Sequence, residues 1–189
     1  MIEIDKATTA FVVIDLQKGI ASSARQLAPH SAATVIQNAA KIADAFRKNN
    51  MPVFLVHVFS SQADRLAALA DEQPWSNTNL PNDWSEFVPE LGPKNGDIVI
   101  TKKQWGAFYG TDLELQLRRR GIKTLVLCGI STNHGVESTA RFAYEYGFQQ
   151  VFVEDAMSSM AAEWHSAAIN IALKRIGRVR STQEILESL

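Results

Sequence analysis

Short apolar runs alternate along the chain with longer stretches whose apolar residues recur at helical spacing. The short runs are rich in β-branched and aromatic residues and are typical of strands buried on both faces. We expect strands at 10–14, 53–59, 97–101, 124–128 and 151–153, with a short sixth strand near Val179. We expect helices at 31–49, 110–120 (beginning near Thr111), 136–146, 161–176 and 182–189.

This alternation predicts an α/β fold in one domain that spans residues 1–189. The sheet should be doubly wound, six-stranded and mainly parallel, with helices on both faces. Ligands of such sheets bind beyond the carboxyl ends of the strands. The residues that directly follow each strand are therefore the first candidates for a site.

The segment 60–96 interrupts the alternation with four prolines and with Trp75 and Trp84. A connection of this length usually has a function or small elements of its own. We expect a short helix at 62–71 and an ordered excursion over the site. Together with Phe87, its tryptophans are candidates for a lid or an interface.

Composition and charge narrow the possible partners. The 189 residues are 46% hydrophobic and 21% charged, as in globular proteins, and their net charge is −1. No basic field attracts nucleic acid or anionic lipid, so neither is expected as a partner. Without a long apolar run or a leader-like N-terminus, we expect no membrane span and a cytoplasmic location.

The chain has a single cysteine, Cys128, which excludes an intramolecular disulfide and a cysteine-rich zinc site. Its place within an apolar strand indicates a small buried hydrophobe. His57 has no metal-ligand pattern around it, and His30 and His165 are far apart in sequence. We therefore expect no metal and, without a nucleotide-binding motif, no other cofactor.

Polar residues follow three of the predicted strands. Asp15 and Gln17 follow the first strand, Lys102 the third, and the small and polar run 129–140 the fourth. Each has an ordinary alternative: a turn aspartate, a solvated lysine and the capping of a helix. Because parallel strands end at one edge of the sheet, the three groups also form a candidate site, with an anion bound at the helix start.

The same residues resemble the isochorismatase-like hydrolase superfamily over nearly the whole chain. The resemblance rests on Asp15 and Gln17, on Lys102 with Ala107-Phe108 and Gly110-Thr111-Asp112-Leu113, and on Gly129-Ile130-Ser131-Thr132 with Thr139-Ala140. It implies a Cys–Asp–Lys triad in which Asp15 is the acid–base group and Lys102 its partner. It also implies a cis bond at Ile130–Ser131 and an oxyanion site at the Ser131 N–H.

The chain departs from that triad at the nucleophile. The cysteine should stand six positions after Gly129, where the residue is Gly135, and glycine cannot form a thioester. The isochorismatases proper resemble this chain there, because they carry glycine and cleave a vinyl ether. The resemblance thus implies a cysteine-independent hydrolase of a small molecule, with Asp15 as general acid and room at Gly135.

Further residues near these positions are candidates for binding the substrate. Trp105 and Phe108 could form an aromatic wall or pack in the core, and His134 could position substrate or serve structure. Ile20 matches a pocket position or is a core contact, and Ile130 and Ser131 accompany the cis bond. Gln17 completes the predicted binding set.

Two further possibilities remain for the function. A catalytically silent ligand-binding or scaffolding protein would keep the fold and pocket without turnover. An amidase is the less favoured enzyme, since the thiol is missing. The resemblance also implies a homo-oligomer, a dimer or a tetramer.

Overall fold

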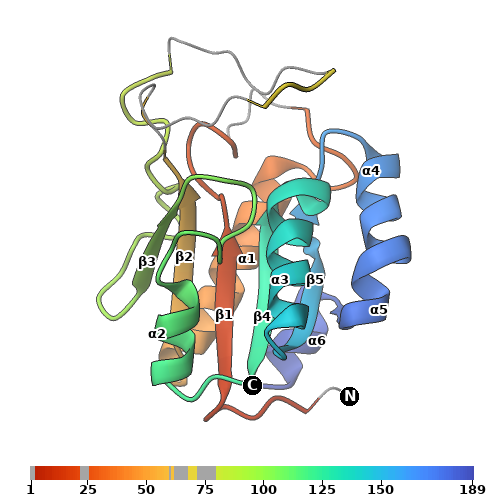
Figure 1. Cartoon of the computed structure of the whole chain (residues 1–189). Coiled ribbons are helices and arrows are strands. Elements are labelled where there is room, and N and C mark those ends of the chain that lie inside the picture. Colours follow the sequence, from red (N-terminus) through yellow and green to blue (C-terminus); the bar gives the residue numbers. More distant parts are fainter. Residues whose placement is uncertain (1–2, 22–25, 60, 62–67, 72–79) are drawn as a thin grey trace.

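The computed structural model describes residues 3–21, 26–59, 61, 68–71 and 80–189. Six parallel strands form one sheet in the order β3-β2-β1-β4-β5-β6, as predicted (Figure 1). The strands are β1 (Thr9–Ile14), β2 (Val53–Val58), β3 (Ile98–Lys102), β4 (Thr124–Ile130), β5 (Gln149–Ser158) and β6 (Arg178–Arg180). The chain reverses its direction of winding between β1 and β4, which makes that edge the expected position of a site.

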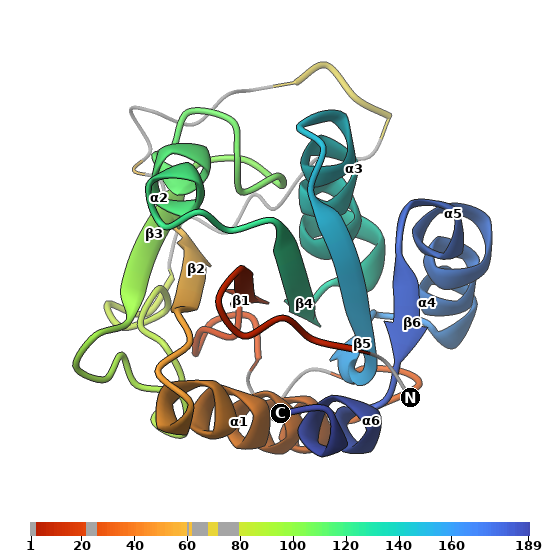
Figure 2. The same ribbon diagram turned by 90° about the horizontal axis from the view of Figure 1, so that it is seen from below.

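Helices cover both faces of the sheet (Figure 2). The helices α1 (Ala32–Lys48) and α6 (Thr182–Glu187) lie on one face. On the other lie α2 (Leu113–Arg119) and α3 (Glu137–Glu145), then α4 (Ala162–Ala167) and α5 (Lys174–Ile176). Two π-helical turns, η2 (Thr132–Val136) and η3 (Ala168–Leu173), precede α3 and join α4 to α5. No helix in the described ranges combines the length and the apolar character needed to cross a membrane.

Most elements differ from their predicted bounds by one or two residues, and β5 differs by more. The strand β5 continues to Ser158 instead of ending at 153, because its pairing with β4 shifts register between Leu127 and Gly129. The polar residues Glu154 and Asp155 fall at this shift and interrupt the apolar run on which the prediction rested. The helix α2 begins at Leu113 rather than near Thr111, whose hydroxyl accepts a bond from the Leu113 N–H.

Residues 80–96, the last part of the excursion, are hydrogen-bonded to the segment that follows β1. Gly19 donates to Trp84 O at 2.8 Å, and Val88 donates to Leu16 O at 3.1 Å. Phe87, a candidate for a lid or an interface, has its side chain buried beside the His57 ring, so it offers no exposed contact surface in the single chain. The expected helix at 62–71 falls mostly on residues outside the described ranges, as does Trp75, and residues 68–71 are not helical.

Candidate active site

Asp15 directly follows β1, at the edge of the sheet where the chain reverses its direction of winding. Its backbone has a φ of 54°, and its N–H donates to Val56 O at 2.9 Å. Beside it, Gly129 has a φ of +126°, and a Cβ there would lie 2.0 Å from Ile14 O. Only glycine therefore allows β4 to approach β1 this closely. The carboxyl of Asp15 is held in the interior, with 5% of the residue exposed.

Lys102 is the last residue of β3, which is two strands away from β1 in the sheet, and its side chain extends to Asp15. Its Nζ lies 2.7 Å from Asp15 Oδ2 and donates to Gln104 O at 3.0 Å and Trp105 O at 2.8 Å. These three acceptors match the three donors of an ammonium group. The other carboxyl oxygen, Asp15 Oδ1, has no hydrogen-bond partner within the described part of the chain. The sequence prediction that Asp15 and Lys102 meet is therefore confirmed.

The protonation of Asp15 reflects two opposed influences. Burial raises the pKa of the Asp15 carboxyl, whereas the charge and hydrogen bond of Lys102 lower it. Burial is the larger influence, so the pKa of Asp15 lies above its ordinary value. At a given pH, a larger fraction of Asp15 is therefore protonated than of an aspartic acid side chain in water.

Gly135 lies in η2 and occupies the place that a nucleophilic side chain would take. A Cβ at this residue would lie 3.0 Å from Asp15 Oδ2 and 3.5 Å from Lys102 Nζ. Its Cβ would also meet Ile14 Cγ2 at 3.0 Å, so the position is crowded, although its φ lies outside the left-handed region. The structure therefore brings Gly135 against the Asp15–Lys102 pair.

Thr139 connects the position of Gly135 to the segment that follows Lys102. Its hydroxyl donates to Gly135 O at 2.7 Å and accepts from the Ala107 N–H at 3.0 Å. Thr139 belongs to the family pattern, but that pattern alone indicates no role for it. Its spacing of four residues from Gly135 is the signal that could have found this bond, because a helical threonine can reach the carbonyl four residues before it.

The end of β4 matches the expected backbone geometry. The Ile130–Ser131 peptide is cis, as predicted. Ile130 is buried, and the Ser131 hydroxyl donates to Asn133 Oδ1 at 2.7 Å and lies 2.7 Å from Ser159 Oγ. The side chain of Ser131 is thus engaged locally, which leaves its backbone as the part available for an oxyanion.

Gln17 and Ile20 lie close to Asp15 in the chain but have structural contacts. The Gln17 amide donates to Val58 O and Trp84 O and accepts from the Val58 N–H, and the residue has no exposed surface. A substrate could reach it only if these bonds broke, so we give Gln17 no part in the chemistry. Ile20 is partly buried against the core.

The aromatic candidates separate into two groups. Trp105 is 60% exposed, and its ring lies edge-on to His134 with the centroids 4.6 Å apart. Burial lowers the pKa of His134. Phe108 is buried against Phe148 and Tyr146, which corresponds to its core alternative rather than to a pocket wall. Trp105 and His134 therefore remain candidates for contacting the substrate, whereas Phe108 does not.

Cys128 has no surface exposure within β4, as predicted. Burial raises the pKa of its thiol well above the ordinary value.

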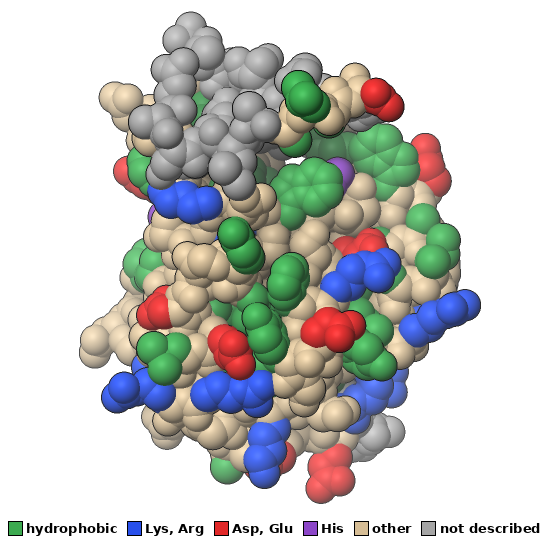
Figure 3. All heavy atoms as spheres, in the orientation of Figure 1, with side chains coloured by type: hydrophobic (Ala, Val, Ile, Leu, Met, Phe, Trp, Pro, Cys, Tyr) green, Lys and Arg blue, Asp and Glu red, His purple; other side chains and the backbone are tan. Residues whose placement is uncertain are grey.

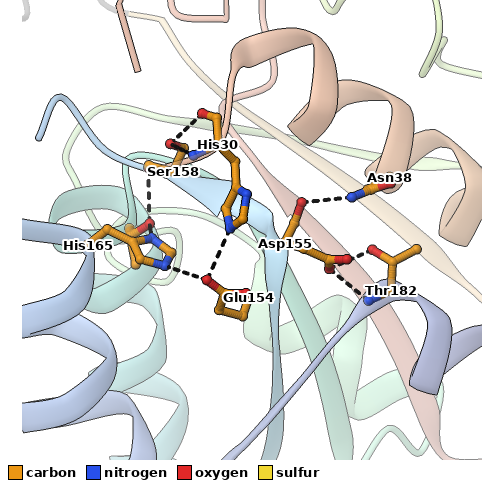
Figure 4. A network of polar contacts seen from close by, with 8 residues as sticks. His30, Asn38, Glu154, Asp155, Ser158, His165 and Thr182 are labelled. Carbon is orange, nitrogen blue, oxygen red and sulfur yellow. Dashed lines mark hydrogen bonds and ion pairs between the residues drawn. The ribbon is translucent and has the colours of Figure 1, made fainter. Parts of the chain in front are cut away.

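A cluster of polar side chains was not predicted from the sequence. His30 and His165, remote in sequence, both contact Glu154 (Figure 4). No spacing rule in the sequence signals that cluster, because its residues come from three different elements.

The fold is a doubly wound parallel sheet, and a buried acid–lysine pair lies where its winding reverses. These two features define an α/β protein with an enzyme-like site. The isochorismatase domain family matches residues 9–184, and the chain belongs to that family.

Two curated relatives are similar along their whole length. The uncharacterized isochorismatase family protein YecD of Escherichia coli O157:H7 is 54% identical, with 100% of both chains covered. YwoC of Bacillus subtilis, described in the same words, is 50% identical over 100% of this chain and 97% of its own. Among solved structures, an isochorismatase family protein of Burkholderia thailandensis superimposes with a TM-score of 0.91. It is 42% identical, with 99% of this chain and 97% of the other covered.

Proposed function

We propose that this protein is a small-molecule hydrolase that works without a cysteine nucleophile and uses Asp15 as a general acid on a vinyl ether or related bond. The observation that carries the proposal is the buried Asp15 carboxyl, whose pKa is raised, beside Gly135, which has no side chain to cover it. A raised pKa keeps a larger share of the carboxyl protonated at a given pH than in a free aspartic acid, and a protonated carboxyl is what general acid catalysis requires.

The proposed reaction needs no covalent intermediate. Asp15 gives its proton to the terminal carbon of the enol ether, and an oxocarbenium ion forms at the ether carbon. Water adds to that carbon and returns a proton to the Asp15 carboxylate. The resulting hemiketal then loses its alcohol and leaves a ketone.

The surrounding groups have supporting roles in this proposal. Lys102 orients the carboxyl through Oδ2, so that the unpartnered Oδ1 is the oxygen free to carry the proton. Gly135 adds no side chain beside either group, and the Ser131 backbone is available to an anionic group of the substrate. Trp105 and His134 offer an adjoining surface for the substrate.

A screen of enol ethers and amides, read by the mass change of each compound, tests this proposal. We expect turnover of an enol ether that Asp15→Asn abolishes, while Lys103→Met, a change in the neighbouring exposed lysine, leaves it intact. Unchanged turnover in Asp15→Asn would disprove the mechanism. Saturable binding without any turnover would instead favour the ligand-binding alternative, and amide hydrolysis by the wild type would favour an amidase.

We further infer a homo-oligomer, a dimer or a tetramer. Hydrophobic side chains gather between α2 and α3 on the face shown in Figure 3. Two exposed aromatic residues belong to these segments: Tyr109 precedes α2, and Phe142 lies in α3. Multi-angle light scattering on the purified chain measures the mass directly. A monomer at every tested concentration would contradict this inference.

A further inference from the structure

A compact group of three potential metal ligands lies apart from the Asp15–Lys102 pair. His30 precedes α1, Glu154 belongs to β5 and His165 belongs to α4 (Figure 4). Glu154 Oε1 lies 3.0 Å from His30 Nε2 and 3.2 Å from His165 Nε2. One ligand atom of each residue lies within 4.8 Å of the others.

The hydrogen bonds of Thr132 determine which nitrogen of His165 carries the proton. The Thr132 hydroxyl donates its single proton to Ser158 O at 3.0 Å, so it must accept from His165 Nδ1, which lies 2.8 Å away. A neutral His165 therefore turns the lone pair of Nε2 toward Glu154 Oε1.

Two acceptor atoms that face each other at 3.2 Å require a proton or a cation between them. The spacing suits a metal ion, because ligands about 2.1 Å from one Zn²⁺ are separated by roughly 3–3.5 Å. Two histidines and one glutamate form a ligand set that zinc binds in proteins, with water in the remaining position. The side chains of His30 and Glu154 are 25% and 38% exposed, so solvent and an ion can reach the cluster.

Neighbouring residues orient these three side chains through hydrogen bonds, as is common around metal ligands in proteins. An outer hydrogen bond that fixes the tautomer of a ligating histidine is a common feature of metal sites, and Thr132 supplies it for His165. The Ser158 hydroxyl donates to His30 O at 2.7 Å, while the His30 N–H donates to Ser158 Oγ at 3.3 Å. The backbone of His30 is thereby fixed on β5.

We propose that His30, Glu154 and His165 form a binding site for one divalent transition-metal ion, with zinc the best match. The ion joins the loop before α1 to β5 and α4. Through His165 it also fixes Thr132, the first residue of the turn that carries Gly135. The site thus positions η2, and it revises the expectation from the sequence that no metal binds. It does not depend on the proposed reaction.

Calorimetric titration of the untagged, chelator-treated full chain with zinc chloride tests this site. We expect one zinc ion per chain and a rise in Tm of roughly 5–10 °C at a free zinc concentration about 100 times Kd. His30→Ala and Glu154→Gln, both at partly exposed positions, should weaken binding by at least the roughly 10–100-fold that loss of an outer partner costs. Visible absorption of bound Co²⁺ should show nitrogen ligation in the wild type and lose intensity in His30→Ala.

His57→Asn serves as the matched control, because His57 lies outside the cluster and contacts Ser85 O and Thr101 instead. It should bind zinc as the wild type does. Circular dichroism checks that each variant is folded. The proposal is overturned if the folded wild type binds no zinc saturably, or if both cluster variants bind zinc as tightly as the wild type.

Discussion

Lys102 Nζ lies 2.7 Å from Asp15 Oδ2 in the interior of the protein, although 87 residues separate them in the chain (102 − 15). The contact exists because β3 and β1 end at the same edge, with β2 between them. Without the lysine, neither oxygen of Asp15 would have a polar partner in the described structure, since Oδ1 already has none.

Removal of Lys102 should therefore destabilise the fold. We expect Lys102→Met to lower the free energy of unfolding by about 3 kcal/mol at pH 8, because it leaves a buried carboxylate unpaired. The loss should be smaller at pH 5, where protonation removes that charge. Urea unfolding at the two pH values measures both effects. Lys103→Met, at an exposed neighbour, should lose much less, and an equal loss in both variants would contradict the prediction.

Asp15 should also give the protein a specific dependence of stability on pH. Because burial raises the pKa of Asp15 in the folded chain, its contribution is complete below the unfolded pKa of about 3.9 and is lost as pH rises through the folded value. Relative to Asp15→Asn, the wild type should thus become less stable over that window. Urea unfolding of both proteins from pH 4 to pH 8 measures the difference, and a constant difference would show that the pKa is not raised.

A thiol introduced at position 135 should react where the native thiol does not. In Gly135→Cys the new side chain would lie beside Asp15 and Lys102, so we expect alkylation by iodoacetamide at position 135 and slow hydrolysis of some amides. Cys128 should stay unmodified while the protein is folded, since burial raises its pKa. Peptide mass mapping locates the label.

Gly135→Ala is the control for that experiment, because it adds the same Cβ without the thiol. Both variants should lose roughly 1–3 kcal/mol of stability through crowding against Ile14 and Asp15. Amide hydrolysis by the alanine variant would show that the thiol is not responsible.

Gly129→Ala should be among the most damaging changes to the fold. Its Cβ would lie 2.0 Å from Ile14 O, and its φ is +126°, so the ends of β1 and β4 would have to separate. We expect a loss of more than about 4 kcal/mol or a failure to fold, read from soluble yield and thermal unfolding. Gly147→Ala has a φ of +78° but open space around it, and it should cost only about 1 kcal/mol.

The strand pattern was sufficient to predict the sheet and the convergence of Asp15 and Lys102, and the resemblance to the family added Gly135 to that site. Apolar runs mark buried parallel strands, and the carboxyl ends of such strands must share an edge. The sequence could not distinguish a pocket wall from a core contact for Phe108, because an aromatic residue after a strand suits both.

The cluster of His30, Glu154 and His165 was beyond prediction for a different reason. It depends on the register shift between β4 and β5, which extends β5 past Glu154, and on where α4 returns to the sheet. Those are properties of packing between distant segments, and no local pattern encodes them.

The backbone at Gly135 has a consequence for how this family can diverge. Its φ is one that any L-amino acid adopts, and the hydrogen bonds of Thr139 to Gly135 O and the Ala107 N–H do not involve a side chain at position 135. Two of the four glycine codons differ from a cysteine codon by a single nucleotide. One point mutation could therefore place a thiol beside Asp15 and Lys102 at the cost of local crowding, so that neighbouring branches of the family can differ at this one position on nearly the same scaffold.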